Sequence, residues 1–154
     1  MKRPNVQISA MGRSVPARVM TNYDFAAIGI ETTHEWVMER TGISERHIAG
    51  ATETTCSMGA AASRVAMQRA GIQPGEIDII ICSTATPDRL LPATAADIQA
   101  ELGATRGAAF DSSAACGGFG YALSLRDGFL TARSAERVLP ECVAETRATT
   151  DRTW

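Results

Sequence analysis

The sequence alternates segments of strand and helix periodicity, which predicts an α/β layered fold with a mostly parallel sheet flanked by helices. Two observations carry this prediction. Residues 77–83 are an almost unbroken apolar run, which is typical of a strand buried on both faces of a parallel sheet. Residues 118–131 have the pattern of a helix whose apolar side chains cover more than half of its circumference, as expected of a buried helix.

The N-terminal third is expected to contain a strand followed by two short helices. Residues 6–10 alternate apolar and polar side chains, a period of two that predicts a strand. The pair Thr21-Asn22 can cap a short helix that follows it. Thr32 and Glu35 have the spacing of a capping box for a second helix, which Gly42 is expected to end.

The middle of the chain predicts a helix, the buried strand and another helix. Apolar residues recur at helical spacing between a cap at Thr54 or Thr55 and the terminating Gly71. Pro92 suits the start of the next helix because its fixed φ is already helical, and Gly103 is expected to close that helix.

The C-terminal third begins with a short predicted strand at residues 108–110, before the buried helix at 118–131. Residues 137–139 then begin like another strand. Pro140 and Glu141 are expected to interrupt it, because a central strand needs a backbone donor and an apolar face.

Length and composition restrict the class of protein. The chain has 154 residues, of which 45% are hydrophobic and 21% charged, and its formal net charge is -2. These values are ordinary for one globular domain and exclude a mostly disordered or fibrous chain. The lack of a basic surplus argues against nucleic-acid binding. The longest apolar stretch, residues 79–82, is far too short to cross a membrane, and no apolar segment follows the first residues, so a cytoplasmic location is expected.

The cysteines and histidines do not form a metal-binding pattern. The four cysteines lie at positions 56, 82, 116 and 142. None lies within metal-ligand spacing of another, and neither His34 nor His47 is near a close cysteine pair, so no structural zinc site is expected. Three of the thiols are expected to be small, inert residues.

Cys116 differs from the other cysteines in its surroundings. Residues 110–120 run from a predicted strand through a tight turn into the most apolar helix. A thiol there lies at a helix N-terminus, where free N–H groups and the helix dipole favour the thiolate. Ala115 and Gly117 leave room for a substrate, so Cys116 is the candidate nucleophile for a covalent thioester, with a small buried core cysteine as the alternative.

Two other interpretations of the same glycines fit less well. A dinucleotide-binding fingerprint requires a third glycine or alanine where this chain has Leu123. An α/β-hydrolase elbow requires glycine two residues before the nucleophile, where Ala114 lies, and a histidine downstream, and no histidine follows His47.

The segment DSSAACGGFGYALSL, residues 111–125, resembles the active-site region of β-ketoacyl-acyl-carrier-protein synthase III, the initiating condensing enzyme of the thiolase superfamily. The segments EWVMERTGI and ERHI within residues 35–48, and TDRT at 150–153, resemble the same family. The predicted helix, strand and helix over residues 58–103 also follow its order. The resemblance covers about residues 5–139, and several motifs in the right order are more specific than any one motif.

The resemblance implies roles for five residues. Cys116 would be the nucleophile that accepts the acyl group. Trp36 and Arg152 would sandwich the adenine of coenzyme A, and Arg40 would meet its phosphate-bearing end. Residues 36 and 40 share a helix face, where a flat π surface and a cation together suit a nucleotide. Leu91 falls where the family has a residue that reaches into the acyl pocket of its dimer partner.

The implied function is that of an acyltransferase in the initiation of fatty-acid or polyketide synthesis. An acyl group would pass from acyl-coenzyme A to Cys116 and then undergo decarboxylative condensation with malonyl-acyl-carrier protein. The expected partners are acyl-coenzyme A, the acyl carrier protein and a second copy of the chain, without nucleic acid or membrane. Coenzyme A thioester enters as a substrate, so no cofactor or metal is expected.

The family's enzymes are about twice as long, and their catalytic His and Asn come from a second half that this sequence does not contain. Residues 1–154 are therefore expected to form a single thiolase-like N-terminal half-domain. The alternative function is a truncated or partner-dependent module that binds acyl-coenzyme A or dimerises without catalysis.

Overall fold

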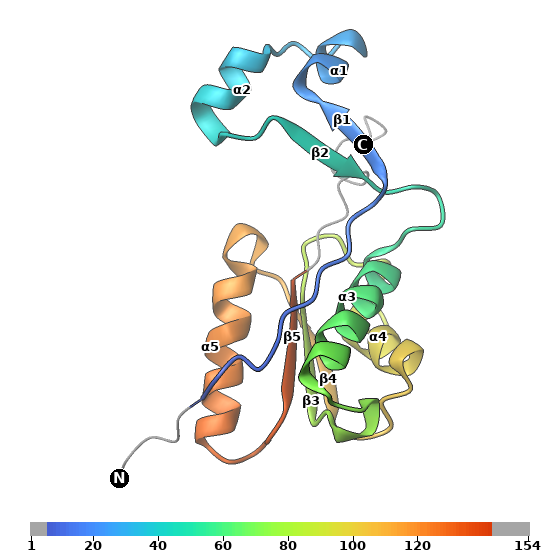
Figure 1. Cartoon of the computed structure of the whole chain (residues 1–154), viewed down its shortest axis with the longest axis vertical. Helices are drawn as coiled ribbons and strands as arrows, with labels where there is room; N and C mark the ends of the chain where they lie inside the picture. The colour runs from blue at the N-terminus through green and yellow to red at the C-terminus, as the bar shows by residue number, and fades with distance from the viewer. Residues whose placement is uncertain (1–5, 143–154) are drawn as a thin grey trace. The chain divides into compact units, whose positions relative to one another are not determined.

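The structure is a computed structural model that describes residues 6–142 of the chain (Figure 1). The described residues group into two compact units. Residues 6–14 and 54–142 make the larger one, called the sheet unit below, and residues 15–53 make the smaller one, called the hairpin unit. None of the helices in the described part of the chain is long and apolar enough to span a membrane.

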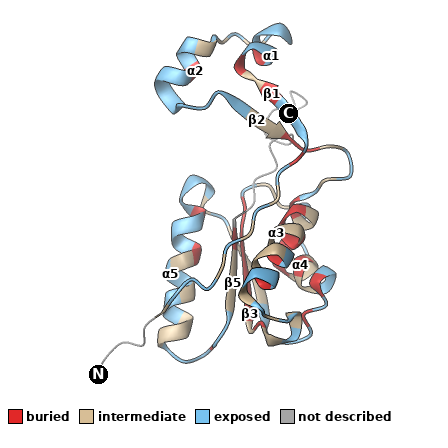
Figure 2. Cartoon of the chain, in the orientation of Figure 1, coloured by how far each residue is buried: buried red, intermediate tan, exposed pale blue. Residues whose placement is uncertain are grey.

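Three parallel strands form the centre of the sheet unit, in the order β4-β3-β5. The central strand is β3 (Ile79–Ser83), with β4 (Ala108–Ser112) on one side and β5 (Val138–Cys142) on the other. Every residue of β3 is buried (Figure 2). The continuous apolar run of this segment thus has the burial expected of a central parallel strand.

Helices cover both faces of this sheet, so that the unit has three layers (Figure 1). On one face lie α3 (Thr55–Ala70) and α4 (Thr94–Leu102), and on the other lies α5 (Gly118–Thr131). Alternate residues of β3 supply the two cores: Ile80 packs with α3 and α4, and Ile81 packs with α5. The predicted α/β layered fold is confirmed.

The helices α3 and α4 begin with different caps. α3 has a capping box in which Thr54 and Ser57 bond each other's backbone N–H groups. α4 has no side-chain cap of its own. Instead, the carboxylate of Asp111, on β4, accepts the backbone N–H groups of Thr94 and Ala95, each at 2.8 Å. This contact fastens the carboxyl end of β4 to the start of α4.

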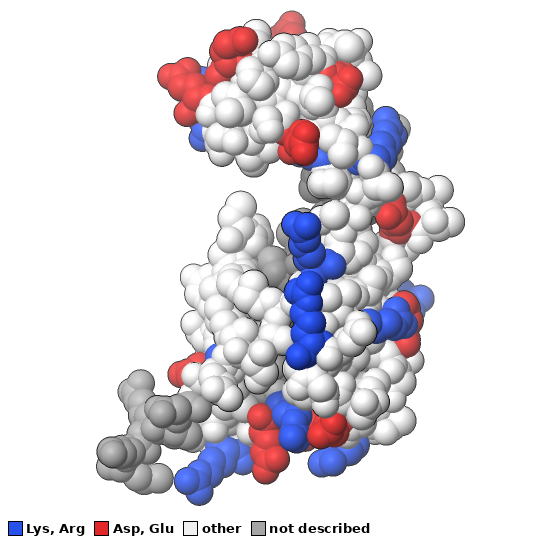
Figure 3. All heavy atoms as spheres, viewed as in Figure 1, with Lys and Arg blue, Asp and Glu red and all other residues white. Residues whose placement is uncertain are grey.

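Ion pairs lie at the opposite, amino ends of the strands. Arg106, before β4, lies 3.7 Å from Asp78, and Arg137, before β5, lies 3.5 Å from Glu76. This end of the sheet unit carries acidic and basic side chains side by side (Figure 3). These ion pairs therefore do not lie at the carboxyl ends of the strands, where ligands of parallel sheets usually bind.

The strand predicted at residues 6–10 does not form, and residues 6–17 have no regular secondary structure. A strand needs a neighbour for its backbone groups, and within the described residues no strand lies beside this segment. The segment packs on α3 instead. Arg69 of α3 donates to the carbonyl oxygen of Met11 at 2.8 Å, and a Cβ added to Gly12 would collide with the backbone of Ala62.

β5 continues through Pro140 and Glu141, where the sequence predicted an interruption. Pro140 pairs with Ile81 in the parallel register. Within the described residues β5 has only β3 as a neighbour, so it is an edge strand, where a residue without a backbone N–H is tolerated.

The hairpin unit contains two antiparallel strands that the sequence did not predict. These are β1 (Arg18–Thr21) and β2 (Glu45–Ile48), paired so that Arg18 lies opposite Ile48. Met20 and Ile48 form a small apolar cluster with Phe25. Because this core is small, few positions of the two short strands need an apolar side chain. Their sequences therefore show little of the alternation that predicts a strand.

Two short helices connect the strands of the hairpin unit. α1 (Asn22–Ala27) starts at the predicted cap, where Thr21 and Asp24 form a capping box. α2 (His34–Thr41) starts one residue later than the predicted cap, because Thr33 rather than Thr32 bonds the N–H of Trp36. α2 ends as predicted at Gly42, which has a left-handed φ of 67°.

Candidate active site

Cys116 lies in a short 3₁₀ turn, η2 (Ala115–Gly117), between the end of β4 and the start of α5. The predicted sequence of strand, turn and helix is therefore present. Ala115 has a φ of 41°, in the left-handed region that residues with a Cβ seldom adopt. Such a conformation directly before the candidate nucleophile makes the turn sharp, and the Cys116 side chain is exposed.

The N-terminus of α5 is open to an anion. Its N-cap residue, Gly117, provides no side-chain hydrogen bond, and the first turn of the helix holds no acidic residue. The first N–H groups of a helix have no partner within the helix, and the helix dipole places positive charge there. A negative charge on Cys116 or on an adjacent ligand oxygen would be stabilised at this position.

The other described thiols are in different environments. Cys82 is completely buried in the centre of the sheet. Cys56 lies on α3 with its Sγ 3.6 Å from an oxygen of Glu101. Burial and the negative charge of Glu101 raise the pKa of Cys56 to about 12, so this thiol stays protonated at neutral pH. The side chain of Cys142 lies outside the described residues.

Two hydroxyl groups at the carboxyl end of the sheet were not singled out from the sequence. Ser83 ends β3, Ser112 ends β4, and the two residues are register partners. Both side-chain oxygens are buried and lack a hydrogen-bond partner among the residues that the structure describes. Ser112 lies four residues before Cys116, so these hydroxyls are at the same edge of the sheet as the turn that contains Cys116. Their only sequence signal is their position at strand ends.

Trp36 and Arg40 lie on one face of α2, as their spacing predicted. The Arg40 guanidinium carbon is 4.4 Å from the centroid of the Trp36 ring, within cation–π range. The Trp36 side chain is 53% exposed, and Arg40 also pairs with Glu39 at 3.5 Å. A flat aromatic surface next to a cation can bind a planar base that carries phosphate groups.

Leu91 belongs to a loop before α4 and is 85% exposed, next to Leu90, which is also exposed. The base of this loop is held by Asp88, whose two carboxylate oxygens accept the backbone N–H groups of Thr55 and Cys56 at 2.8 Å. Large apolar side chains presented to solvent in this way can contact another molecule.

The sequence-predicted site residues lie in both units. Cys116 and Leu91 belong to the sheet unit, and Trp36 and Arg40 belong to the hairpin unit. Arg152 lies outside the described residues. No cluster of His, Cys, Asp and Glu side chains suited to a metal ion occurs in the described part of the chain.

Comparison with known proteins shows which proteins this chain resembles. No family model matches the chain. β-Ketoacyl-[acyl-carrier-protein] synthase III of Brucella melitensis biotype 2 is 52% identical over 132 residues, which are 86% of this chain and 41% of that protein. The synthase of Brucella canis is 51% identical over the same share. The chain thus spans less than half of the length of the curated relatives that it matches.

Solved structures agree with the sequence comparison. The 3-oxoacyl-[acyl-carrier-protein] synthase III of Aquifex aeolicus superposes with a TM-score of 0.87 at 40% identity, over 95% of this chain and 48% of that one. The priming β-ketosynthase of the R1128 polyketide pathway superposes with a TM-score of 0.84 at 37% identity, over 90% of this chain and 41% of that one. In sequence and in its thiolase-like fold, this chain is therefore similar to the N-terminal part of β-ketoacyl-[acyl-carrier-protein] synthase III.

Proposed function

We propose that the chain performs the acyl-loading step of a synthase-III-type condensing enzyme in fatty-acid or polyketide initiation. The Cys116 thiolate attacks the thioester carbonyl of acyl-coenzyme A, a new C–S bond forms, and the coenzyme A thiolate leaves. The leaving thiolate takes up the proton that Cys116 released on ionisation, so one thioester is exchanged for another. The observation that carries this proposal is the exposed Cys116 thiol at the uncapped N-terminus of α5.

The proposed binding site for the nucleotide end of coenzyme A is the pair Trp36 and Arg40. Their stacked arrangement on the exposed face of α2 supports it, because the ring can stack on adenine while the guanidinium meets a phosphate. Arg152 is proposed as the second face of the adenine sandwich. The coenzyme A thioester is a substrate in this scheme, and the reaction needs no resident cofactor.

The second step, decarboxylative condensation with malonyl-acyl-carrier protein, is proposed for the longer enzyme and not for this chain alone. It requires a general acid–base next to the thioester. The chain has two histidines, and the resemblance assigns this role to neither of them. His34 stacks on Tyr23 at 4.9 Å between ring centroids, and the Nδ1 of His47 lies 2.6 Å from the carbonyl oxygen of Pro16. Loss of an acid–base group typically lowers a rate by about 10²- to 10⁴-fold.

Intact-mass measurement after mixing the chain with acetyl-coenzyme A tests the loading step. One acetyl group should appear on the chain, and it should be absent from the Cys116→Ala variant. The Cys56→Ala variant is the matched control and should be acetylated like the parent chain, because Cys56 is protonated at neutral pH. Failure of the parent chain to gain mass would refute the proposal. We expect no sustained condensation by this chain alone. Sustained formation of a β-ketoacyl product by the chain alone, abolished in Cys116→Ala, would contradict that expectation.

The second candidate function is a non-catalytic module that binds acyl-coenzyme A and dimerises in the cytoplasm. The exposed Leu90 and Leu91 favour it, since two adjacent large apolar side chains in water promote association. Intact mass and light scattering together discriminate: acetylation of Cys116 supports the enzyme, whether or not the chain dimerises, and a dimer that binds acetyl-coenzyme A without acetylation supports the module. Substitution of both leucines by serine should abolish such a dimer.

A further inference from the structure

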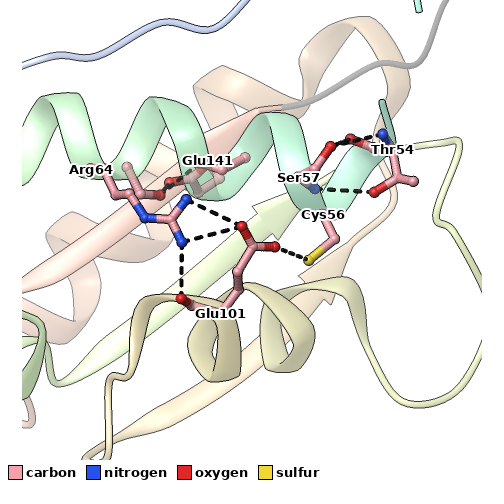
Figure 4. Close-up of polar contacts among 8 residues, drawn as sticks. Thr54, Cys56, Ser57, Arg64, Glu101 and Glu141 are labelled. Carbon is pink, nitrogen blue, oxygen red and sulfur yellow. Dashed lines mark hydrogen bonds and ion pairs between the residues drawn. The ribbon is translucent and has the colours of Figure 1, made fainter. Parts of the chain in front are cut away.

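Glu141 is a carboxyl group inside the sheet unit that the proposed chemistry does not use. It lies on β5, opposite Cys82 of the central strand, and its side chain points into the layer between the sheet and α3 (Figure 4). Only 6% of the residue is exposed. Its contact on α3 is the hydroxyl of Ser63, which is hydrogen-bonded to one carboxyl oxygen of Glu141 and also to the carbonyl oxygen of Gly59 at 2.9 Å.

The space for this carboxyl group depends on a glycine of α3. A Cβ built at Gly59 would lie 3.2 Å from the second carboxyl oxygen of Glu141 and even closer to the side chain of Ile98. Residues on the same side of the sheet, such as Met58 and Ile80, form the larger apolar core. The carboxyl group is thus enclosed by apolar side chains, with one hydroxyl group as its hydrogen-bond donor.

Most of the charged groups on the elements around Glu141 contact other residues. Arg64, next to Ser63, pairs with Glu101 of α4 at 3.2 Å on the outer surface (Figure 4). On the helices, Cys56 is hydrogen-bonded to Glu101, Arg69 to the carbonyl oxygen of Met11, and Asp97 is paired with Arg89. On β4, Asp111 caps α4. The other titratable groups on α3, α4, β3, β4 and the N-terminal segment are Cys82 and Arg13. No cation among the described residues forms an ion pair with Glu141.

These surroundings disfavour the ionised form of the carboxyl group. Burial raises the pKa of Glu141 from 4.5 to about 7, and the hydrogen bond from Ser63 opposes this rise only in part. At acidic pH a neutral acid is packed between β5 and α3. Above neutrality the same place holds a carboxylate with one hydroxyl donor and no counter-charge within the described contacts.

We propose that Glu141 makes the packing of α3 on β5 pH-sensitive: the neutral acid holds the two elements together, and its ionisation loosens them. The unfolded chain ionises this group at a pKa of 4.5, and the folded chain does so at about 7. The stabilisation is therefore complete below pH 4.5 and is lost as the pH rises through about 7. The ratio of folded to unfolded chain falls by about 300-fold over that range.

The first test measures urea unfolding of the full chain between pH 5 and pH 8.5, followed by far-ultraviolet circular dichroism. The parent chain should lose stability with rising pH by up to about two orders of magnitude in the folding ratio. Glu141→Gln has nearly the same shape without the titration, so its stability should vary much less. Glu136→Gln removes a carboxylate that is 89% exposed in the same unit, and it should behave like the parent chain. Equal pH dependence in the parent and Glu141→Gln would overturn the proposal.

A second measurement needs no folded variant of Glu141. Carbon-13 NMR of glutamate carboxyl groups in the parent chain should contain one resonance with a midpoint near pH 7. In Ser63→Ala that midpoint should move upward, because the donor that favours the ionised form is removed. If every carboxyl group titrates below pH 5 in the folded parent chain, the proposal is wrong.

Discussion

Replacement of Asp111 by alanine should weaken the sheet unit at the strand that leads to Cys116. The Asp111 carboxylate on β4 accepts two backbone N–H groups at the start of α4, those of Thr94 and Ala95, at 2.8 Å each. Alanine removes both acceptors at once. Because α4 has no side-chain cap of its own, no other group in the helix replaces them.

The size of this effect follows from the two hydrogen bonds. A hydrogen bond to a charged group contributes about 1.5–3 kcal/mol, and loss of a helix N-cap typically costs about 0.5–2 kcal/mol. The site is only partly buried, so water can replace part of the loss. We expect Asp111→Ala to lower the free energy of unfolding by about 2–4 kcal/mol, and Asp111→Asn, which keeps one oxygen acceptor, by about half as much.

Urea unfolding at pH 7 measures these differences directly. Asp127, an exposed residue of α5, provides the matched control, and Asp127→Ala should change the free energy of unfolding by less than about 0.5 kcal/mol. If Asp111→Ala is as stable as Asp127→Ala, the carboxylate does not fasten β4 to α4 and the reasoning is refuted.

Two further predictions concern the candidate site. Brief iodoacetamide treatment at pH 8 followed by peptide mapping should label Cys116 before Cys56. The Cys56 thiol has a pKa of about 12, so only about one part in 10⁴ of it is thiolate at that pH. Faster labelling of Cys56 would contradict this prediction. Trp36→Ala should weaken acetyl-coenzyme A binding by about 5- to 30-fold, as expected for loss of a stacking surface worth about 1–2 kcal/mol, while the urea midpoint of the sheet unit stays unchanged. Unchanged affinity in isothermal titration calorimetry would remove Trp36 from the proposed site.

Much of the sheet unit could be predicted because its signals are local. The apolar run of β3 and the helical periodicity of α3 and α4 survive in the structure with nearly the expected ends. Gly71 and Gly103 were expected to end those helices, and both have left-handed φ angles, 68° and 71°. A glycine after a helical pattern is informative because other residues rarely adopt that conformation.

The helix at residues 118–131 forms as predicted but is not a buried helix: its buried residues are Gly118 and Ala122, and Phe119 and Tyr121 are 50% and 63% exposed. The other errors came from features that depend on distant partners. Alternation at residues 6–10 has the right period for a strand, but period alone does not supply a neighbouring strand. The antiparallel pair β1 and β2 was missed for the opposite reason. Each of these strands has a partner, but they are only four residues long and most of their residues are polar, so they lack a clear alternating pattern. At the site, the glycines indicated the turn around Cys116, whereas the positive φ of Ala115 has no sequence signal.

The row formed by Asp111, Cys82 and Glu141 shows that the surroundings of a carboxyl group, and not its residue type alone, decide its role in this sheet. The register places these three residues side by side across β4, β3 and β5, with Asp111 and Glu141 both reaching the α3–α4 layer. Asp111 meets a helix N-terminus, where two N–H groups stabilise an anion. Glu141 meets one hydroxyl group in an apolar core, where the neutral acid is favoured. The sequence pattern predicted that Glu141 interrupts the strand, because it assumed a charged side chain. The neutral acid can be buried at this position, and the pattern does not include that form.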